Sequence, residues 1–335
     1  MNLPQRISIL VRLGEWMLSH EEDWLQAQER AGLENGWFTP DFRKQAIEQI
    51  ARQWLQKEAL ENWAAGEMTP LEREHPRLIG IVMAGNIPLV GFHDWLAVFI
   101  SGHRSLIKPS SKDQALLSAI LKKLNEWAPA LATDHQLAER LSGCDAYIAT
   151  GSNNSSRYFE HYFGKYPNII RRNRTSVALL CGQETQIQLE ALADDVHSYF
   201  GLGCRNVTKL YVPEGYDFIA LLEAFKKYAA LADHHKYKNN YDYNLALHIL
   251  NKKYYMTNGS ILLIEDSRFF APVSQLNYEF YSNKNEVQAS LKDHPELQCL
   301  IGEGGIPFGQ GQQPALNDYA DGVNSLSFLN KKMLN

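Results

Sequence analysis

One of the four cysteines has a sequence environment suited to nucleophilic chemistry. Cys204 follows a predicted apolar helix and stands in a glycine-rich turn, with Gly201 and Gly203 before it and a predicted strand after it. The glycines let the backbone approach a substrate closely, and the cationic Arg205 and Lys209 would favour a thiolate. Taken alone, the pattern is more typical of a small core residue, so a catalytic interpretation depends on the rest of the sequence.

Three further segments carry polar side chains directly after predicted strands. Asn86 and Lys108 have ordinary interpretations as a turn former and a strand-end lysine, and Ser152 as a helix cap. The segments read Gly85-Asn86-Ile87-Pro88, Lys108-Pro109-Ser110-Ser111 and Thr150-Gly151-Ser152.

Standard motifs for nucleotides, metals and hydrolases are missing from the sequence. There is no G-x-x-x-x-G-K-[ST], no G-x-G-x-x-G after a predicted strand, no H-E-x-x-H and no G-x-S-x-G. The neighbouring His234 and His235 lack the spacing of two helical metal ligands, and the cysteines form no C-x-x-C pair. We therefore expect no metal site.

Predicted strands and helices alternate around the polar segments. This alternation indicates βαβ units and a parallel sheet. The tract 232–258 is polar, rich in Tyr and Asn, and has no assignable pattern. Strands are predicted at 78–85, 105–108, 146–150, 177–180, 209–213 and 260–264, and helices at 88–100, 113–127, 187–200 and 217–231.

The first 65 residues have helical periodicity. Asn35-Gly36 separates two periodic stretches, and Thr39-Pro40-Asp41 is a start signal for the second. We expect two Trp-rich amphipathic helices that cover the sheet.

Composition excludes several classes of protein. The 335 residues are 45% hydrophobic and 21% charged, with a formal charge of −5, so the chain has enough apolar surface to fold. A mildly acidic chain is a poor candidate for sequence-independent nucleic-acid binding. No apolar run is long enough for a membrane span. The start lacks the pattern of a secretory signal and the four cysteines are widely spaced, which together predict a cytoplasmic protein.

Together, the motifs resemble the aldehyde dehydrogenase superfamily. Phe200 to Val212 is similar to its nucleophile loop, where a Gly-x-x-Cys turn is followed by a basic residue that opens a strand. The resemblance implies that Cys204 is the nucleophile and that the Asn86 amide faces the reacting carbonyl. It further implies a cofactor site made by Lys108, Pro109, Ser110 and Ser111 at the adenosine ribose, Gly151 and Ser152 at the pyrophosphate, and Phe270 under the nicotinamide ribose. Ile306-Pro307-Phe308-Gly309 is similar to a turn near the end of family members.

One departure from the family narrows the chemistry. Hydrolytic members carry a Glu on the strand before the nucleophile, whereas here no carboxylate appears between Arg174 and Gly182. Without a base to activate water, a Cys204 thioester should await another nucleophile or a hydride. The chain therefore looks most like the LuxC-type fatty acyl-CoA reductases. Ser111 in place of an acidic residue, beside Lys112, favours NADPH over NADH.

The resemblance implies reduction of an acyl-CoA, with coenzyme A as the leaving group, to an aldehyde through an acyl-cysteine. A short-chain CoA-acylating aldehyde dehydrogenase is the alternative enzyme. The alternative of another class is a non-catalytic protein that binds a nucleotide or an acyl group. The acyl group can arrive on coenzyme A or on a protein, so an acyl-activating partner protein is a further expectation.

The expected fold is α/β and aldehyde dehydrogenase-like, with a Rossmann-type parallel-sheet cofactor domain and a smaller α/β catalytic domain. A final strand, Asp321 to Leu329, is expected to pair with another subunit in a homo-oligomer. The expected boundaries are a helical N-terminal segment at 1–75 that packs on the cofactor domain, the NAD(P)-binding domain at 76–175, the catalytic domain at 176–310 and a C-terminal strand at 311–335.

Overall fold

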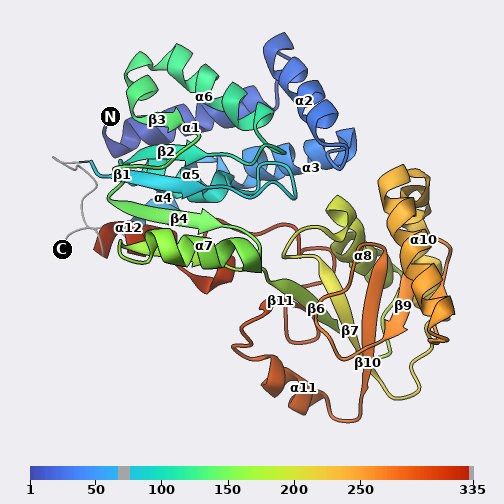
Figure 1. Ribbon diagram of the computed structural model, residues 1–335. Coiled ribbons are helices and arrows are strands. Elements are labelled where there is room, and N and C mark those ends of the chain that lie inside the picture. Colours follow the sequence, from blue (N-terminus) through green and yellow to red (C-terminus); the bar gives the residue numbers. More distant parts are fainter. Residues whose placement is uncertain (67–75, 332–335) are drawn as a thin grey trace. The chain divides into compact units, whose positions relative to one another are not determined.

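The computed structural model describes residues 1–66 and 76–331, which form two compact units (Figure 1). Unit 1 consists of Met1–Asn173 and Ala315–Asn335, and unit 2 of Arg174–Pro314. The chain therefore leaves unit 1 once, builds unit 2, and returns. No helix in the described ranges is long and apolar enough to cross a membrane.

Unit 1 is built on a five-stranded sheet in which every pair of neighbours is parallel. The central strand has the sequence Leu-Ile-Gly-Ile-Val, and both of its isoleucines are buried, as in parallel sheets covered on both faces. The order across the sheet is β3 (His135–Leu137), β2 (Arg104–Lys108), β1 (Leu78–Val82), β4 (Ala146–Thr150) and β5 (Asn168–Arg171).

The N-terminal region is helical, as predicted, but it forms four helices where the periodicity predicted two. A π-helical turn at Ile50–Trp54 and short breaks divide the chain, and Asn2 and Thr39 cap two of the helices. Their buried faces belong to the same apolar core as the sheet. The helices are α1 (Leu3–Met17), α2 (Glu22–Glu34), α3 (Pro40–Gln49) and α4 (Lys57–Ala65).

Three more helices connect the strands of unit 1. Between β1 and β2, α5 (Phe92–Ile100) is apolar on nearly every side and is almost completely buried, as expected for an internal helix. Helix α6 (Ala115–Trp127) follows β2 and buries one apolar stripe. Helix α7 (Asn153–Phe163) packs against β4 and β5.

The predicted C-terminal strand is wrong. Residues 325–331 form helix α12 (Ser325–Lys331), which follows a short 3₁₀ turn. Leu326 and Leu329 lie three positions apart, so a helix places both on one face, and both are fully buried in the core of unit 1. The buried Arg171 donates to Ala320 O at 2.5 Å and to Ser325 Oγ at 3.3 Å. Because this segment packs within its own unit, it offers no free strand for pairing with another subunit.

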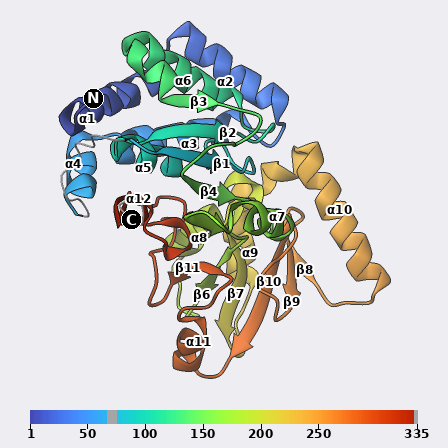
Figure 2. The same cartoon turned by 60° about the vertical axis from the view of Figure 1, so that its left-hand side comes forward.

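Unit 2 contains a six-stranded sheet, in which only the pair β8 and β9 is antiparallel. Figure 2 brings β8 and α9 into view beside its other strands. The order is β11 (Leu297–Gly302), β6 (Thr175–Leu179), β7 (Val207–Pro213), β10 (Gln275–Tyr281), β9 (Leu262–Glu265) and β8 (Met256–Thr257).

Four helices accompany the sheet of unit 2. The tract without an assignable pattern contains α10 (His235–Leu250), which buries only Tyr237, Tyr241 and Asn244. The other helices are α8 (Gln186–His197), α9 (Ile219–Ala224), which continues as a 3₁₀ segment to Asp233, and α11 (Lys284–Leu291).

Candidate active site

The sheet of unit 1 brings three of the predicted segments to one edge. Val82 at the end of β1 is aligned with Lys108 of β2 on one side and with Ala149 of β4 on the other. Asn86 therefore follows the central strand, between the segments that begin at Lys108 and Gly151. The chain runs from β1 outward to β2 and β3 and then crosses to β4 and β5. The carboxyl ends of β1 and β4 thus form a switch point, where open α/β sheets bind ligands.

The loop after β2 offers cationic and hydroxyl groups to solvent. Lys108, Ser111 and Lys112 are exposed, and the Lys108 ammonium has no hydrogen-bonding or ionic partner among the described residues. Pro109 and Ser110 are half-buried. Ser110 Oγ accepts the Lys112 N–H at 3.2 Å, which shapes the loop. Ammonium and hydroxyl groups are the partners that ribose hydroxyls and phosphates require, so these residues fit a phosphorylated nucleotide.

The segment after β4 also fits a phosphate. Ser152 Oγ accepts the Ser155 N–H at 3.3 Å and caps α7, which has no acidic residue in its first turn. A Cβ on Gly151 would lie 2.8 Å from the Phe159 ring, so glycine is required for this close packing. The capping interpretation of Ser152 is confirmed. The N-terminal end of α7 keeps a partial positive charge that favours an anion.

The turn that carries Asn86 is held by a buried carboxylate. Asp113 Oδ2 accepts the Leu89 N–H at 2.7 Å, and Leu89 has a left-handed φ of 56°. A Cβ on Gly85 would lie 2.5 Å from Ser110 Oγ, which shows how tightly the turn packs on the loop after β2. Burial raises the pKa of Asp113 to about 7 although backbone N–H groups act against the shift. Its other oxygen, Oδ1, is buried without a hydrogen-bond partner.

In unit 2, Cys204 lies in a loop with unusual backbone geometry. After α8 the chain passes through Tyr199, Phe200 and Gly201, with left-handed φ values of 54°, 57° and 73°. Non-glycine residues rarely adopt this region, so surrounding contacts must hold it. Cys204 itself is half-buried, in the turn that leads into β7.

Asn206 supplies the principal anchor of this loop. Its side chain is fully buried, and its Oδ1 accepts the Gly203 N–H at 2.8 Å. Its Nδ2 faces three backbone carbonyls, those of Asp195 at 3.0 Å, Val196 at 3.4 Å and Ser198 at 2.8 Å. One amide thus fastens the residue before Cys204 to the end of α8.

A serine on the neighbouring strand links Cys204 to a second cysteine. Ser176 Oγ donates to Cys204 O at 3.1 Å and lies 2.9 Å from Cys299 Sγ. Ser176 is fully buried on β6, and Cys299 lies where the pairing of β11 with β6 shifts register. The backbone carbonyl of Cys204 is therefore held by a buried side chain of β6.

The glycine-rich loop near residue 310 is tied to the same region. Asp195 accepts the Gly309 N–H at 2.6 Å and the Gly311 N–H at 2.8 Å, one on each carboxylate oxygen. Burial raises the pKa of Asp195 to about 6 despite these bonds. Arg205 Nε donates to Gly311 O at 2.6 Å. The Ile306-Pro307-Phe308-Gly309 turn thus lies beside the candidate nucleophile loop within unit 2.

The expectation that Lys209 favours a thiolate is not supported by its contacts. Its side chain is 1% exposed, and its ammonium binds Glu279 at 2.5 Å and Ser267 O at 2.6 Å. It also lies over the Tyr211 ring. The buried ammonium already has a carboxylate partner, because Lys209 and Glu279 point to the same face of adjacent strands.

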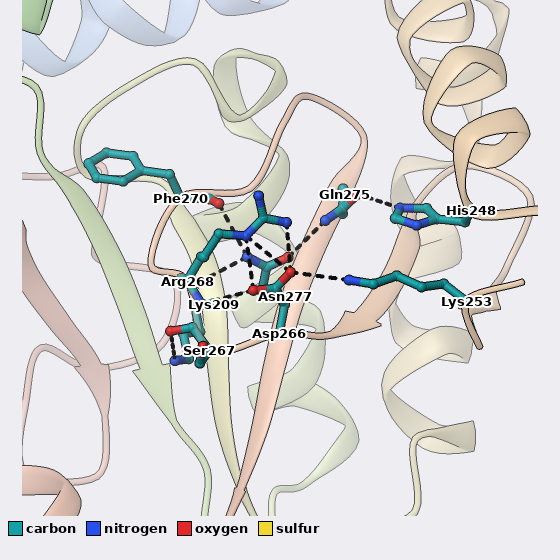
Figure 3. A network of polar contacts seen from close by, with 9 residues as sticks. All are labelled: Lys209, His248, Lys253, Asp266, Ser267, Arg268, Phe270, Gln275 and Asn277. Carbon is teal, nitrogen blue, oxygen red and sulfur yellow. Dashed lines mark hydrogen bonds and ion pairs between the residues drawn. The ribbon is translucent and has the colours of Figure 1, made fainter. Parts of the chain in front are cut away.

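Phe270 belongs to a segment organised by a polar network (Figure 3). Asn277 Nδ2 donates to Phe270 O at 3.2 Å and to Arg268 O at 2.9 Å. Gln275 connects Asn277 to His248, at 2.8 Å on both sides. The Phe270 ring points away from this network, so the network fixes the backbone and leaves the half-buried ring available for a contact.

Three anchoring residues, Asp113, Asn206 and Asp195, were not anticipated from the sequence. The one sequence feature that could have indicated an anchoring role is the position of Asn206, two residues after the cysteine. Asn in a glycine-rich turn is ordinary turn chemistry, which hides its role. Asp113 and Asp195 act on residues distant in the chain, and short-range patterns carry no information about such contacts.

The fold places the chain in a known structural class. It is similar to the NAD-dependent aldehyde dehydrogenase from Sinorhizobium meliloti, with a TM-score of 0.67 and 14% identity over 95% of this chain and 72% of that one. It is also similar to an NADP-dependent enzyme of E. coli, with a TM-score of 0.67 and 13% identity over 90% of this chain and 73% of that one. A third similar structure is aldehyde dehydrogenase 21 from Physcomitrella patens in complex with the reaction product succinate. Its TM-score is 0.65, with 13% identity over 90% of this chain and 74% of that one. The chain therefore has the aldehyde dehydrogenase fold.

Residues 25–236 match the family model described as acyl-CoA reductase (LuxC). The match covers more than half of the chain and includes Asn86, Lys108 and Cys204, and the chain belongs to this family. No curated protein matches the sequence. Family and fold together support an aldehyde-related oxidoreductase that uses a nicotinamide cofactor.

Proposed function

We propose that the protein reduces an acyl thioester, with a fatty acyl-CoA as the first choice, to an aldehyde through an acyl group on Cys204. The observation that carries this proposal is the Cys204 loop. Its left-handed backbone is held by Asn206 and Ser176, although a cysteine with a purely structural role needs no such support. Costly local backbone geometry of this kind concentrates at functional sites.

The arrangement of carboxylates in unit 2 supports transfer of the acyl group over hydrolysis. Glu184 lies beyond the carboxyl end of β6, where it accepts the Cys181 N–H at 2.5 Å. Ser176, which contacts Cys204 O, lies near the other end of this strand, roughly 10–15 Å away by strand rise. Asp195 uses both oxygens on backbone N–H groups. Neither group is placed as a free base for water, so a Cys204 thioester should persist.

The chemistry assigned to this chain begins with the Cys204 thiolate. Its sulfur forms a bond to the thioester carbonyl carbon, and collapse of the tetrahedral intermediate breaks the bond to the coenzyme A sulfur, which leaves as a thiolate. We assign the Asn86 amide and the Cys204 backbone N–H as donors to the oxyanion, where loss of one donor typically costs about 3–4 kcal/mol. A nicotinamide cofactor, when bound, would supply a hydride to the acyl carbon. The carbon–sulfur bond to Cys204 would then break, which releases the aldehyde and restores the Cys204 thiolate.

The cofactor is assigned to the carboxyl edge of the sheet in unit 1. The exposed Lys108 and Ser111, with Lys112 beside them, suit the 2′-phosphate of NADPH. Phe270 of unit 2 is assigned to the nicotinamide ribose. The full set proposed for cofactor binding is Lys108, Pro109, Ser110, Ser111, Gly151, Ser152 and Phe270.

The test uses the purified chain with acyl-CoA substrates of increasing length. We expect NADPH oxidation that depends on acyl-CoA, and an acyl adduct on Cys204 detected by peptide mass spectrometry when cofactor is omitted. Cys204→Ala should abolish both. Cys181→Ala, which changes the exposed cysteine, is the matched control and should keep both. A Cys204→Ala protein that retains turnover, or an adduct on Cys144, Cys181 or Cys299, would refute the assignment.

A further inference from the structure

A cavity of unit 2 lies far from Cys204. It has a volume of about 670 Å³ and lies at the carboxyl ends of β9 and β10, on the side where α9 begins. Cys204 precedes the first residue of β7, whereas Tyr216 and Phe218 of the cavity follow its last residue, Pro213. A strand of seven residues spans roughly 23 Å. The cavity is therefore separate from the candidate nucleophile loop.

The walls of this cavity are rich in aromatic rings. The Phe218 ring lies 4.6 Å from that of Tyr278 at 52°, and 5.0 Å from that of Tyr216 at 74°. The Tyr278 and Phe280 rings are 5.5 Å apart at 78°. Tyr254 completes the set and is 73% exposed. Neighbouring rings are therefore inclined to one another and not stacked, which is an arrangement that aromatic pairs prefer.

The polar groups of the cavity are acidic. Asp217 and Glu265 line it, and no lysine or arginine does. Asp217 Oδ1 accepts the Ile219 N–H at 2.9 Å, but Glu265 has no hydrogen-bonding or ionic partner among the described residues. Two carboxylates and no cation among the lining residues favour a positively charged ligand over an anion.

A tyrosine adds a hydroxyl group to the cavity wall. Tyr278 is 2% exposed, and its hydroxyl has no hydrogen-bond partner among the described residues. Burial and the nearby Glu265 carboxylate raise the pKa of Tyr278, so the group remains a neutral phenol. Tyr278 lines the cavity, and a neutral phenol can donate a hydrogen bond to a ligand there.

We propose that this cavity binds a small organic cation, an alkylammonium or quaternary ammonium compound with apolar substituents. Aromatic faces attract ammonium groups, the carboxylates compensate the charge, and the volume suits a whole small molecule. An anion would meet two carboxylates. A bare metal ion would lack ligands, because the described residues contain no cluster of three metal-binding side chains.

Calorimetry of the full chain with choline tests the proposal. All seven tryptophans precede residue 128 and belong to unit 1, so none lines this cavity and calorimetry is the direct measurement. We expect choline to bind with a Kd in the millimolar range or below. Its uncharged isostere 3,3-dimethylbutan-1-ol should bind about tenfold more weakly, because it retains the shape but loses the cation–aromatic attraction.

Variants identify the site. Glu265→Gln and Tyr254→Leu change exposed side chains and should each weaken choline binding several-fold. Glu296→Gln removes the same charge from an exposed position of unit 2 outside the cavity and should leave binding unchanged. The proposal is overturned if choline does not bind, if the isostere binds equally well, or if the two cavity variants behave like Glu296→Gln. These outcomes are independent of acyl-CoA reduction.

Discussion

The Asn86 turn of unit 1 and the Cys204 loop of unit 2 are held by different kinds of group. A carboxylate, Asp113, holds the turn, with a raised pKa and one oxygen lacking a partner. A neutral amide, Asn206, holds the loop, and both of its polar atoms are hydrogen-bonded. The Asn86 turn is therefore anchored in a pH-dependent way, whereas the principal anchor of the Cys204 loop does not titrate.

Loss of the amide anchor should have the largest effect. Asn206→Ala leaves the Gly203 N–H and several carbonyls unpaired in a buried region, which should lower the free energy of unfolding by about 3 kcal/mol or more. Urea denaturation measures this loss. The reaction of Cys204 with iodoacetamide should also lose its site selectivity relative to Cys181.

Asn206→Asp sharpens the interpretation. An aspartate keeps an acceptor for Gly203 but replaces the donor to three carbonyls with a second acceptor. It should be nearly as damaging as Asn206→Ala. An Asn206→Ala protein with unchanged stability and labelling would show that the Cys204 loop keeps its conformation without the Asn206 amide.

Removal of the carboxylate anchor should alter the pH dependence of stability. The pKa of Asp113 is about 7 in the folded state against 3.8 ordinarily, so the folded state binds a proton that the unfolded state has released. This group therefore favours folding most below about pH 4, and the contribution is lost as the pH rises to about 7.

Asp113→Asn should remove this pH-dependent contribution to the free energy of unfolding. The difference in unfolding free energy between the two proteins, followed from pH 4 to pH 8, should shift in favour of the variant by up to a few kcal/mol. The difference isolates Asp113 from other groups, such as the buried His135 and His197, whose pKa values are lowered by burial. Parallel curves for the two proteins would contradict the assigned pKa.

Substitution of one glycine near the Asn86 turn and one near the Cys204 loop should lower stability by a smaller amount. Gly85→Ala forces a Cβ to within 2.5 Å of Ser110 Oγ, and such overpacking costs about 1–3 kcal/mol. Gly201→Ala meets no atom closer than 3.4 Å but keeps a φ of 73°, which costs about 1–2 kcal/mol. Thermal denaturation should rank Gly85→Ala as the more damaging. The reverse order would mean that the Asn86 turn yields more easily than the Cys204 loop.

The smallest effect on stability should come from Lys108. Lys108→Met changes an exposed side chain with no described partner and should leave Tm nearly unchanged. If the side chain binds the cofactor, KM for NADPH should rise about tenfold, while the Cys204 adduct still forms without cofactor. Ser111→Asp should reduce the preference for NADPH over NADH. An unchanged KM in both variants would remove the loop after β2 from the cofactor site.

Much of unit 1 was predictable because its strands are short apolar runs bounded by turn residues. The strand at 146–150 is placed by its sequence to the residue, and Asn86, Lys108 and Gly151 follow from the strand ends. In unit 2, β10 has the sequence Gln-Leu-Asn-Tyr-Glu-Phe-Tyr, whose polar positions bind neighbouring backbone and side chains and disguise a buried strand. Helix α10 buries too few residues for a visible apolar period.

The candidate site was predictable only where resemblance supplied it. Cys204 and Asn86 carry family patterns, whereas Asp113, Asn206 and Asp195 act through contacts that folding creates. The C-terminal segment departs from the family pattern that predicts a strand, because Leu326 and Leu329 have helical spacing and a helix buries both side chains.

The return of the chain to unit 1 has a consequence for folding during synthesis. Arg171 needs Asp94, Ala320 O and Ser325 Oγ, and α12 fills part of the core around α5. When residue 173 leaves the ribosome, these last partners have not been made. Unit 2 has a continuous sequence and can complete its core first, although its synthesis begins later. Unit 1 is synthesised first but stays partly open until α12 has been made. During this interval the chain most needs protection by chaperones.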